Sequence, residues 1–194
     1  MRILHLSDTH LDRVDGPNGH GVNARDSLRR ILDACREVQN IDVVVVTGDI
    51  ADDGSREAYA DALELIGGFV RERRVPAIFS TGNHDERQAF MDVLGSGHVG
   101  TTGTGQPTDM LSSAHGERTA VSHVAGYRIV TLDSLVPGKG YGRISGAQLV
   151  WLREVLAEPA PNGTILAFHH PPIALDVEAP AQDWTAAFCL PSTS

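Results

Sequence analysis

The sequence is poor in the features that mark secreted, redox-active or membrane proteins. It has two cysteines, Cys35 and Cys189, which are too far apart to form a redox pair or a zinc knuckle. The apolar run Val43 to Val46 is far too short to cross a bilayer, and the N-terminus turns polar at Ser7 before a signal-peptide core could form. We therefore expect a cytoplasmic protein without a membrane span, in which Cys35 is a buried thiol.

Basic residues are scarce relative to acidic ones. The 194 residues include 16 Lys and Arg against 25 Asp and Glu, so the formal net charge is −9. Nucleic acid and anionic membranes repel such a chain at long range, so we expect neither as a strong partner. The charge does not exclude a small phosphate substrate held by metal ions. Length and a 41% hydrophobic content allow one globular domain with a real core, and we assign residues 1–194 to it.

Three short apolar runs in the first half predict buried strands. They cover residues 3–6, 43–46 and 77–80. Apolar residues at helical spacing fill the two connections, with Asn23 and Ser55 as N-cap residues. Strands that alternate with helices form a largely parallel sheet through right-handed crossovers. The first half therefore predicts an α/β fold.

The second half predicts a different mixture of elements. Residues 95–118 are rich in Gly, Thr and Ser without apolar periodicity, which predicts a long surface loop. Residues 119–132 predict a hairpin, and residues 164–168 predict a further strand. Between them, Ser145 and Gln148 have the form of a capping box at a helix start. The apolar residues of this helix are expected on one broad face: Leu149, Val150, Leu152, Val155 and Leu156. With this half included, the class becomes α+β.

Residues that can bind a metal follow the predicted strands. The set comprises Asp8, His10, Asp49, Asn83, His84 and His169. Because the carboxyl ends of parallel strands share one rim, where ligands bind in open α/β sheets, we expect these side chains to converge. Each residue alone also has a structural explanation, since an aspartate can cap a turn and a histidine can lie at the surface. The joint occurrence at strand ends favours a metal site.

Four motifs occur in order at these strand ends. They are Asp8-Thr9-His10, Gly48-Asp49-Ile50-Ala51-Asp52, Gly82-Asn83-His84-Asp85 and His169-His170-Pro171. Together they resemble the signature of the calcineurin-like metallophosphoesterases, from residue 3 to about residue 175. Within that superfamily, segments such as Leu132-Asp133-Ser134 are most similar to the bacterial class III cyclic nucleotide phosphodiesterases. The resemblance implies a sandwich of mixed β-sheets flanked by helices, here incomplete at the C-terminus.

The resemblance also implies which residues hold two divalent metal ions. Asp8 and His10 would bind one ion, Asn83 and His169 the other, and Asp49 would bridge them. Two ions about 3.5 to 4 Å apart activate a shared water and clamp the oxygens of a phosphoester. Oxygen and imidazole ligands suit Mn, Fe or Zn, and these ligand types do not distinguish one of the three metals from the others. The implied reaction is hydrolysis of a small-molecule phosphodiester, with 3′,5′-cyclic nucleotides as the expected substrates.

Further residues receive roles from the same resemblance. His84, with Asp85 beside it, resembles the acid that protonates the leaving oxygen, so both are candidate catalytic residues. Asp52 is expected to bond backbone groups, and His170 to lie beside the site or face the substrate. Asp53 stands where phosphoprotein phosphatases of the superfamily have an arginine that grips phosphate. A phosphoprotein substrate is therefore disfavoured.

The sequence departs from the family at one point. The family supplies one more histidine to each ion from a late Gly-His-x-His motif, which neither Gly19-His20 nor Gly97-His98 completes. We therefore expect the chain to lack the part that carries this motif and to expose an apolar face near its C-terminus. Two alternative functions stay open: a general phosphomonoesterase or nuclease on the same fold, and a non-catalytic metal-binding remnant. A homodimer also stays open.

Overall fold

The computed structural model describes residues 1–100, 109–111 and 116–172, which form two four-stranded sheets and four α-helices. The first sheet has the order β1 (Ile3–Leu6), β2 (Val43–Thr47), β3 (Ala77–Ser80) and β4 (His98–Val99). The second has the order β5 (Asp109–Met110), β6 (Ala120–Val124), β7 (Tyr127–Thr131) and β8 (Thr164–Ala167). The helices are α1 (Ala24–Ala34), α2 (Arg56–Arg73), α3 (Arg87–Leu94) and α4 (Gly146–Ala157), with a 3-10 turn η1 (Cys35–Glu37). None of these helices is long and apolar enough to cross a membrane.

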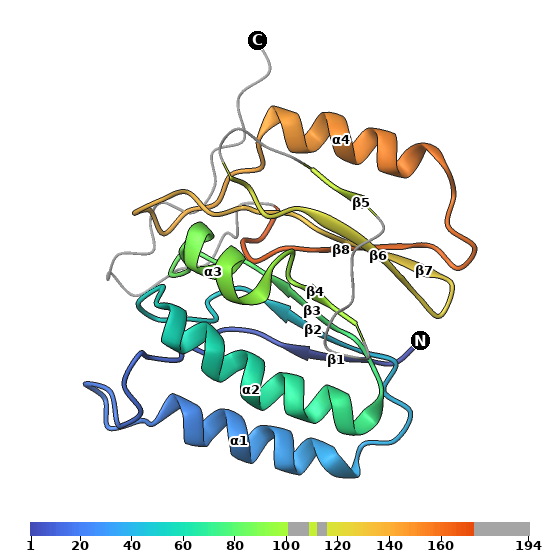
Figure 1. Cartoon of the computed structure of the whole chain (residues 1–194). Coiled ribbons are helices and arrows are strands. Elements are labelled where there is room, and N and C mark those ends of the chain that lie inside the picture. The colour runs from blue at the N-terminus through green and yellow to red at the C-terminus, as the bar shows by residue number, and fades with distance from the viewer. Residues whose placement is uncertain (101–108, 112–115, 173–194) are drawn as a thin grey trace, which may run out of the picture.

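The first sheet has the parallel core that the sequence predicts. β1, β2 and β3 pair in parallel, and β4 adds an antiparallel edge. α1 and α2 cover the outer face of this sheet (Figure 1). Buried residues such as Leu28 of α1 and Ile66 of α2 pack in one cluster with Val44 and Val46 of β2. This packing fixes the strand ends relative to one another, and the candidate ligands follow those ends.

Three helices begin at the N-cap residues that the sequence predicts. The side chains of Asn23, Ser55 and Ser145 each accept a hydrogen bond from an amide of the first helical turn. Each bond satisfies an amide that a helix start leaves without an intrahelical partner. The Gln148 side chain turns inward, where it is buried and bonds the backbone amide and carbonyl of Asp133.

The two sheets stack face to face, and α4 covers the far side of the second sheet (Figure 1). Between the sheets, Val45 and Ile78 of the first pack against Ile129 and Ala167 of the second. On the far side, Trp151 of α4 packs against residues of β6 and β7. The sandwich of mixed sheets flanked by helices is therefore confirmed.

The segment 95–118 differs from the surface loop that the sequence predicts, because it contains β4 and β5. His98 of β4 is only 3% exposed and lies between the sheets. Its Nδ1 is 2.7 Å from Ser122 Oγ, and its Nε2 is 2.9 Å from Thr131 Oγ1. Burial lowers the pKa of His98 to about 4, so the ring is neutral at neutral pH. Strands of two residues show no periodicity, and much of the remaining segment lies outside the described residues.

The helix α4 also departs from its prediction. Leu149, Val150 and Leu156 are 45%, 55% and 43% exposed, whereas Trp151 packs on the sheet. The broad apolar face is therefore only partly buried, because a helix that rests on one sheet buries one stripe and these three residues lie outside it. Leu166 of β8 is exposed as well. The exposed apolar face expected near the C-terminus stays a prediction, because residues 173–194 lie outside the described residues.

Candidate metal centre

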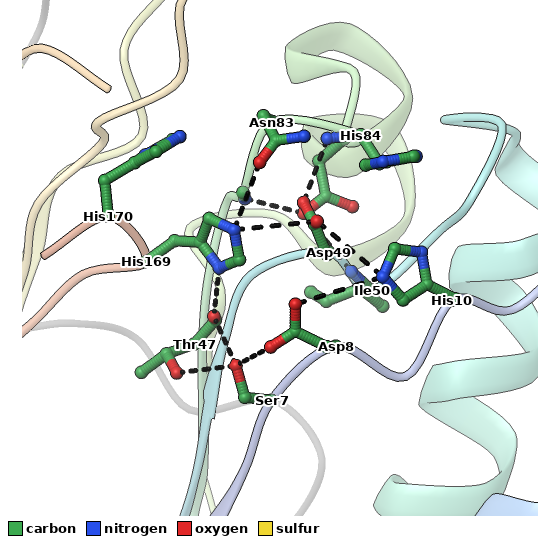
Figure 2. Close-up of polar contacts among 12 residues, drawn as sticks. Ser7, Asp8, His10, Thr47, Asp49, Ile50, Asn83, His84, His169 and His170 are labelled. Carbon is green, nitrogen blue, oxygen red and sulfur yellow. Dashed lines mark hydrogen bonds and ion pairs between the residues drawn. The ribbon is translucent and has the colours of Figure 1, made fainter. Parts of the chain in front are cut away.

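The predicted ligands converge, but they come from two sheets. Asp8, Asp49 and Asn83 follow β1, β2 and β3 of the first sheet. His169 follows β8, which pairs with β7 in the second sheet. Figure 2 shows His169 reaching Asp49 and Asn83 from its own side. The predicted convergence is confirmed, while the single shared sheet edge is wrong, because β8 never joins the first sheet.

The Asp49 carboxylate lies at the centre of the cluster. It is 4% exposed, and its Oδ2 lies 3.8 Å from Nε2 of His10 and 3.5 Å from Nε2 of His169. Its Oδ1 accepts a hydrogen bond of 2.9 Å from the backbone amide of His84. Oδ2 thus faces two imidazole nitrogens that come from two different sheets of the fold.

The backbone of three predicted ligands is strained. Asp8, His10 and Asp49 have φ angles of 56°, 42° and 48°, in the left-handed region that non-glycine residues seldom adopt. The two turns brace each other, because the amides of Asp8 and His10 donate to the carbonyls of Gly48 and Asp49 at 3.1 and 2.9 Å. Gly48 itself has φ 79°, and a Cβ there would clash with His169. Tight packing holds the strain at these positions.

His169 is held in one orientation by the first sheet. Its Nδ1 donates to the carbonyl oxygen of Thr47 at 2.9 Å, which leaves the lone pair of a neutral ring on Nε2. Nε2 lies 3.2 Å from Oδ1 of Asn83 and 3.5 Å from Oδ2 of Asp49. An imidazole nitrogen, an amide oxygen and a carboxylate oxygen are ligand types that divalent first-row metals take. The donor set therefore fits a divalent ion.

His10 is held in the same way by a carboxylate. Its Nδ1 donates to Oδ1 of Asp52 at 2.8 Å, which again leaves Nε2 as the acceptor. Nε2 lies 3.9 Å from Oδ1 of Asp8 and 3.8 Å from Oδ2 of Asp49. The expectation that Asp52 bonds backbone groups is wrong. The turn after β2 places its side chain beside the rings of His10 and His84 instead.

Two groups of side chains are close enough to hold an ion each. The donor atoms of His10, Asp49 and His84 lie within 4.8 Å of one another, and so do those of Asp8, Asp49 and His169. Asp49 belongs to both groups, which matches a bridging ligand. Asp8 also lies 3.9 Å from His10, so the implied set of Asp8, His10 and Asp49 fits the geometry too.

Comparison with known proteins agrees with this geometry. Residues 1–189 match the family described as calcineurin-like phosphoesterase. This chain belongs to that family. The family explains why motifs far apart in the sequence supply one cluster of aspartate, asparagine and histidine side chains.

Three curated relatives of this phosphoesterase domain come from bacteria. A Rhodococcus erythropolis protein named "Probable cyclic nucleotide phosphodiesterase" is 40% identical over 88% of this chain and 52% of its own length. A cAMP/cGMP dual specificity phosphodiesterase from Mycobacterium tuberculosis is 37% identical over 88% of this chain and 50% of its own length. The 3′,5′-cyclic adenosine monophosphate phosphodiesterase CpdA of Escherichia coli is 33% identical over 89% and 56%. The chain spans about half the length of these relatives.

His84 lies at the open side of this calcineurin-like site. Its side chain is 41% exposed, and its Nδ1 donates to the backbone carbonyl of Asp52 at 3.0 Å. Its ring meets that of His10 edge-on, with ring centroids 4.8 Å apart. With Nδ1 bonded to the protein, Nε2 is the nitrogen available to a substrate. The position suits the predicted role of an acid.

Asp85 is placed differently from its neighbour. It is 6% exposed, and its carboxylate accepts hydrogen bonds from the Tyr59 hydroxyl and from three backbone amides. Burial raises the pKa of Asp85, and hydrogen bonds from Gly82 and Ala51 oppose the shift. The Asp85 carboxylate thus faces backbone amides and Tyr59 inside the protein, and its catalytic role stays a prediction of the sequence.

Polar residues that sequence reasoning missed surround the ligands. The Ser7 hydroxyl donates to the Asp8 carboxylate, and Nε2 of His5 lies 2.7 Å from Oγ1 of Thr47. The alternation along β1, which places His5 and Ser7 on one face, could have pointed to this pair. Tyr59 carried no such signal, because its position on α2 matches an ordinary apolar site.

The other candidate histidines do not belong to the ligand cluster. His170 is buried, its Nδ1 is 2.7 Å from Oγ of Ser134, and its ring meets His169 edge-on. Burial and the neighbouring His169 lower the pKa of His170. Figure 2 shows its ring to one side of the cluster. His20 is exposed in the loop before α1, where its amide bonds the side chain of Asn18.

Proposed function

We propose that this chain carries the metal-binding part of a phosphodiesterase that hydrolyses 3′,5′-cyclic nucleotides with a metal-activated water. The observation that carries the proposal is the position of the Asp49 carboxylate. Its Oδ2 lies 3.8 Å from Nε2 of His10 and 3.5 Å from Nε2 of His169. A carboxylate between two such nitrogens can bridge two ions, which is the arrangement of dinuclear phosphoesterase sites.

The proposed cofactors are two divalent ions of Mn, Fe or Zn. Asp8 and His10 would hold one ion, Asn83 and His169 the other, and Asp49 both. Carboxylate, amide and imidazole ligands together suit these metals better than Ca²⁺. When bound, such ions lower the pKa of a shared water and clamp the attacking and leaving oxygens of the ester.

The side chains of the protein supply orientation and a proton. Bonds from Nδ1 of His10 to Asp52 and from Nδ1 of His169 to Thr47 direct both Nε2 atoms toward Asp49. His84 is exposed beside them, and its Nδ1 is bonded to the Asp52 carbonyl. Its Nε2 is therefore the atom proposed to donate a proton to the leaving oxygen.

The proposed substrate is a small diester. The three relatives described above carry cyclic nucleotide phosphodiesterase names. The net charge of −9 opposes long-range attraction of nucleic acid, which favours a small diester over a nuclease substrate. Asp53, where phosphoprotein phosphatases have arginine, forms an ion pair of 2.6 Å with Arg13. The acidic side chain at this position supports ranking phosphodiesters above phosphoproteins.

Hydrolysis assays with added Mn²⁺ test the proposal. We expect 3′,5′-cyclic AMP and bis(p-nitrophenyl) phosphate to be hydrolysed faster than p-nitrophenyl phosphate or a phosphopeptide, and EDTA to stop the reaction. The exposed His20 offers a matched control, because His20→Ala should leave the rate unchanged. Preferred hydrolysis of the monoester or of single-stranded DNA would favour a phosphomonoesterase or a nuclease. Mn²⁺ binding without hydrolysis of any ester would favour the non-catalytic alternative.

Three features stay predictions of the sequence. They are a single domain over residues 1–194, a cytoplasmic location and an oligomeric state of monomer or homodimer. Light scattering after size exclusion measures the oligomeric state directly.

A further inference from the structure

Asp85 gathers four hydrogen-bond donors around one buried carboxylate. Its Oδ2 accepts from the amide of Gly82 at 2.8 Å and from that of Ile50 at 3.3 Å. Its Oδ1 accepts from the Tyr59 hydroxyl at 2.9 Å and from the amide of Ala51 at 3.0 Å. A carboxylate that leaves water regains its solvation only through such bonds, and bonds to a charged acceptor are stronger than neutral ones.

These donors belong to the two turns that carry the central ligands. Ile50 and Ala51 directly follow Asp49, and Gly82 directly precedes Asn83. The turns touch each other, because a Cβ at Gly82 would overlap the Asp49 side chain. The spacing of Asp49 and Asn83 is therefore set where these turns meet, and Asp85 binds both turns at that point.

The turn after β2 needs such support. Asp49 has a left-handed φ of 48°, which costs free energy unless neighbouring bonds hold it. On one side, the amides of His10 and Leu11 donate to the carbonyls of Asp49 and Ile50, each at 2.9 Å. On the other side, the amides of Ile50 and Ala51 donate to Asp85. The turn is thus bonded from both sides.

We propose that Asp85 is a positioning residue, whose carboxylate sets the distance between Asp49 and Asn83 by binding the backbone of both turns. It acts on a metal ion only through those ligands and does not contact a substrate. The metal part of this inference rests on the proposed function, whereas the backbone part stands on the hydrogen bonds alone.

The test compares Asp85→Asn with a variant that destabilises the same core away from the turns. Ile66, fully buried on α2, offers this control through Ile66→Ala. Asparagine keeps one acceptor oxygen and turns an NH2 donor toward the backbone amides that bonded the other oxygen, either Ala51 or Ile50 and Gly82, so those amides should exchange with deuterium faster than in wild type. Mn²⁺ affinity, measured by calorimetry on the full chain, should fall by about 10- to 100-fold in Asp85→Asn. Ile66→Ala should lower the unfolding temperature without either effect.

A milder variant keeps the proposal testable if Asp85→Asn does not fold. Tyr59→Phe removes one of the four donors and leaves the carboxylate in place, so it should weaken Mn²⁺ binding less than Asp85→Asn. Unchanged amide exchange in Asp85→Asn, Mn²⁺ affinity in Tyr59→Phe equal to wild type, or equal loss of Mn²⁺ affinity in Ile66→Ala would overturn the proposal. If wild type binds no Mn²⁺, the proposed function fails, and amide exchange alone decides the role of Asp85.

Discussion

Nε2 of His169 lies 3.5 Å from Oδ2 of Asp49, although the two residues follow strands of different sheets. The approach depends on Gly48, where a Cβ would clash with the Cβ of His169. Because Gly48 has no side chain, the segment after β8 can come close to the end of β2. The candidate metal centre lies at this junction, so its geometry depends on how the two sheets pack.

Asp49→Ala should remove both ions at once, because the carboxylate is shared by both donor groups. We expect metal content to fall from two ions to none after dialysis and hydrolysis to fall by at least about 100-fold. Elemental analysis by mass spectrometry measures the first effect and a diester assay the second. A variant that keeps two ions would contradict the bridging role.

His84→Ala should slow hydrolysis while metal content stays near wild type. The exposed ring is bonded to Asp52 through Nδ1, and we assign it proton donation rather than metal binding. Loss of a general acid lowers turnover by about 100- to 10,000-fold. Parallel elemental analysis decides the point, because a loss of metal would make His84 a ligand in the group with His10 and Asp49.

Asp52→Ala should weaken metal binding without removing a ligand. The variant takes away the acceptor that holds Nδ1 of His10 at 2.8 Å, so the ring can rotate or change tautomer. We expect Mn²⁺ affinity to fall by about 10- to 100-fold, as measured by calorimetry. Arg13→Ala, which removes the ion-pair partner of the adjacent Asp53, is the control. An affinity equal to wild type would show that Asp52 does not orient His10.

The stability of the fold should decrease in acid because of His98. Its pKa is about 4 in the folded protein and near 6.5 when unfolded, so the unfolded chain binds the proton more tightly. The stability that depends on a neutral His98 ring is complete above pH 6.5. It falls as the pH drops from 6.5 toward 4, and the full loss is about 3 kcal/mol. Urea unfolding at about pH 7.5 and about pH 5 should show the loss in wild type and in His20→Asn. A His98→Asn variant with the same pH dependence as wild type would refute this origin.

Adding a C-terminal segment with Gly-His-x-His should strengthen metal binding. The resemblance implies that this motif adds one imidazole to each ion, and the chain spans about half the length of its curated relatives. Fusion to the remaining half of the Rhodococcus erythropolis relative should raise Mn²⁺ affinity and diester hydrolysis by at least about 10-fold. A 194-residue chain that already matches the fusion in both measurements would show that other groups complete the site.

Several local elements and the residues that gather at the candidate site could be predicted from the sequence. The caps at Asn23, Ser55 and Ser145 lie where predicted, because capping depends on a side chain and the amides of the next turn. The apolar runs form β1, β2, β3 and β8, because a short continuous apolar run is also a local signal, typical of a buried strand. The polar residues after these strands were recognisable because metals take carboxylate, amide and imidazole ligands and because sites in α/β sheets lie at strand ends.

Only the tertiary structure decided how these pieces meet. Pairing of β8 with β7 rather than with the first sheet depends on contacts between distant segments, which no local pattern contains. The burial of Asp85 and His98 has the same origin, since each is surrounded by groups from several elements. The Asp52 side chain became a partner of His10 because a turn after β2 brought it there. Local sequence encodes which atoms are available, whereas packing of the sheets decides their distances and their exposure to water.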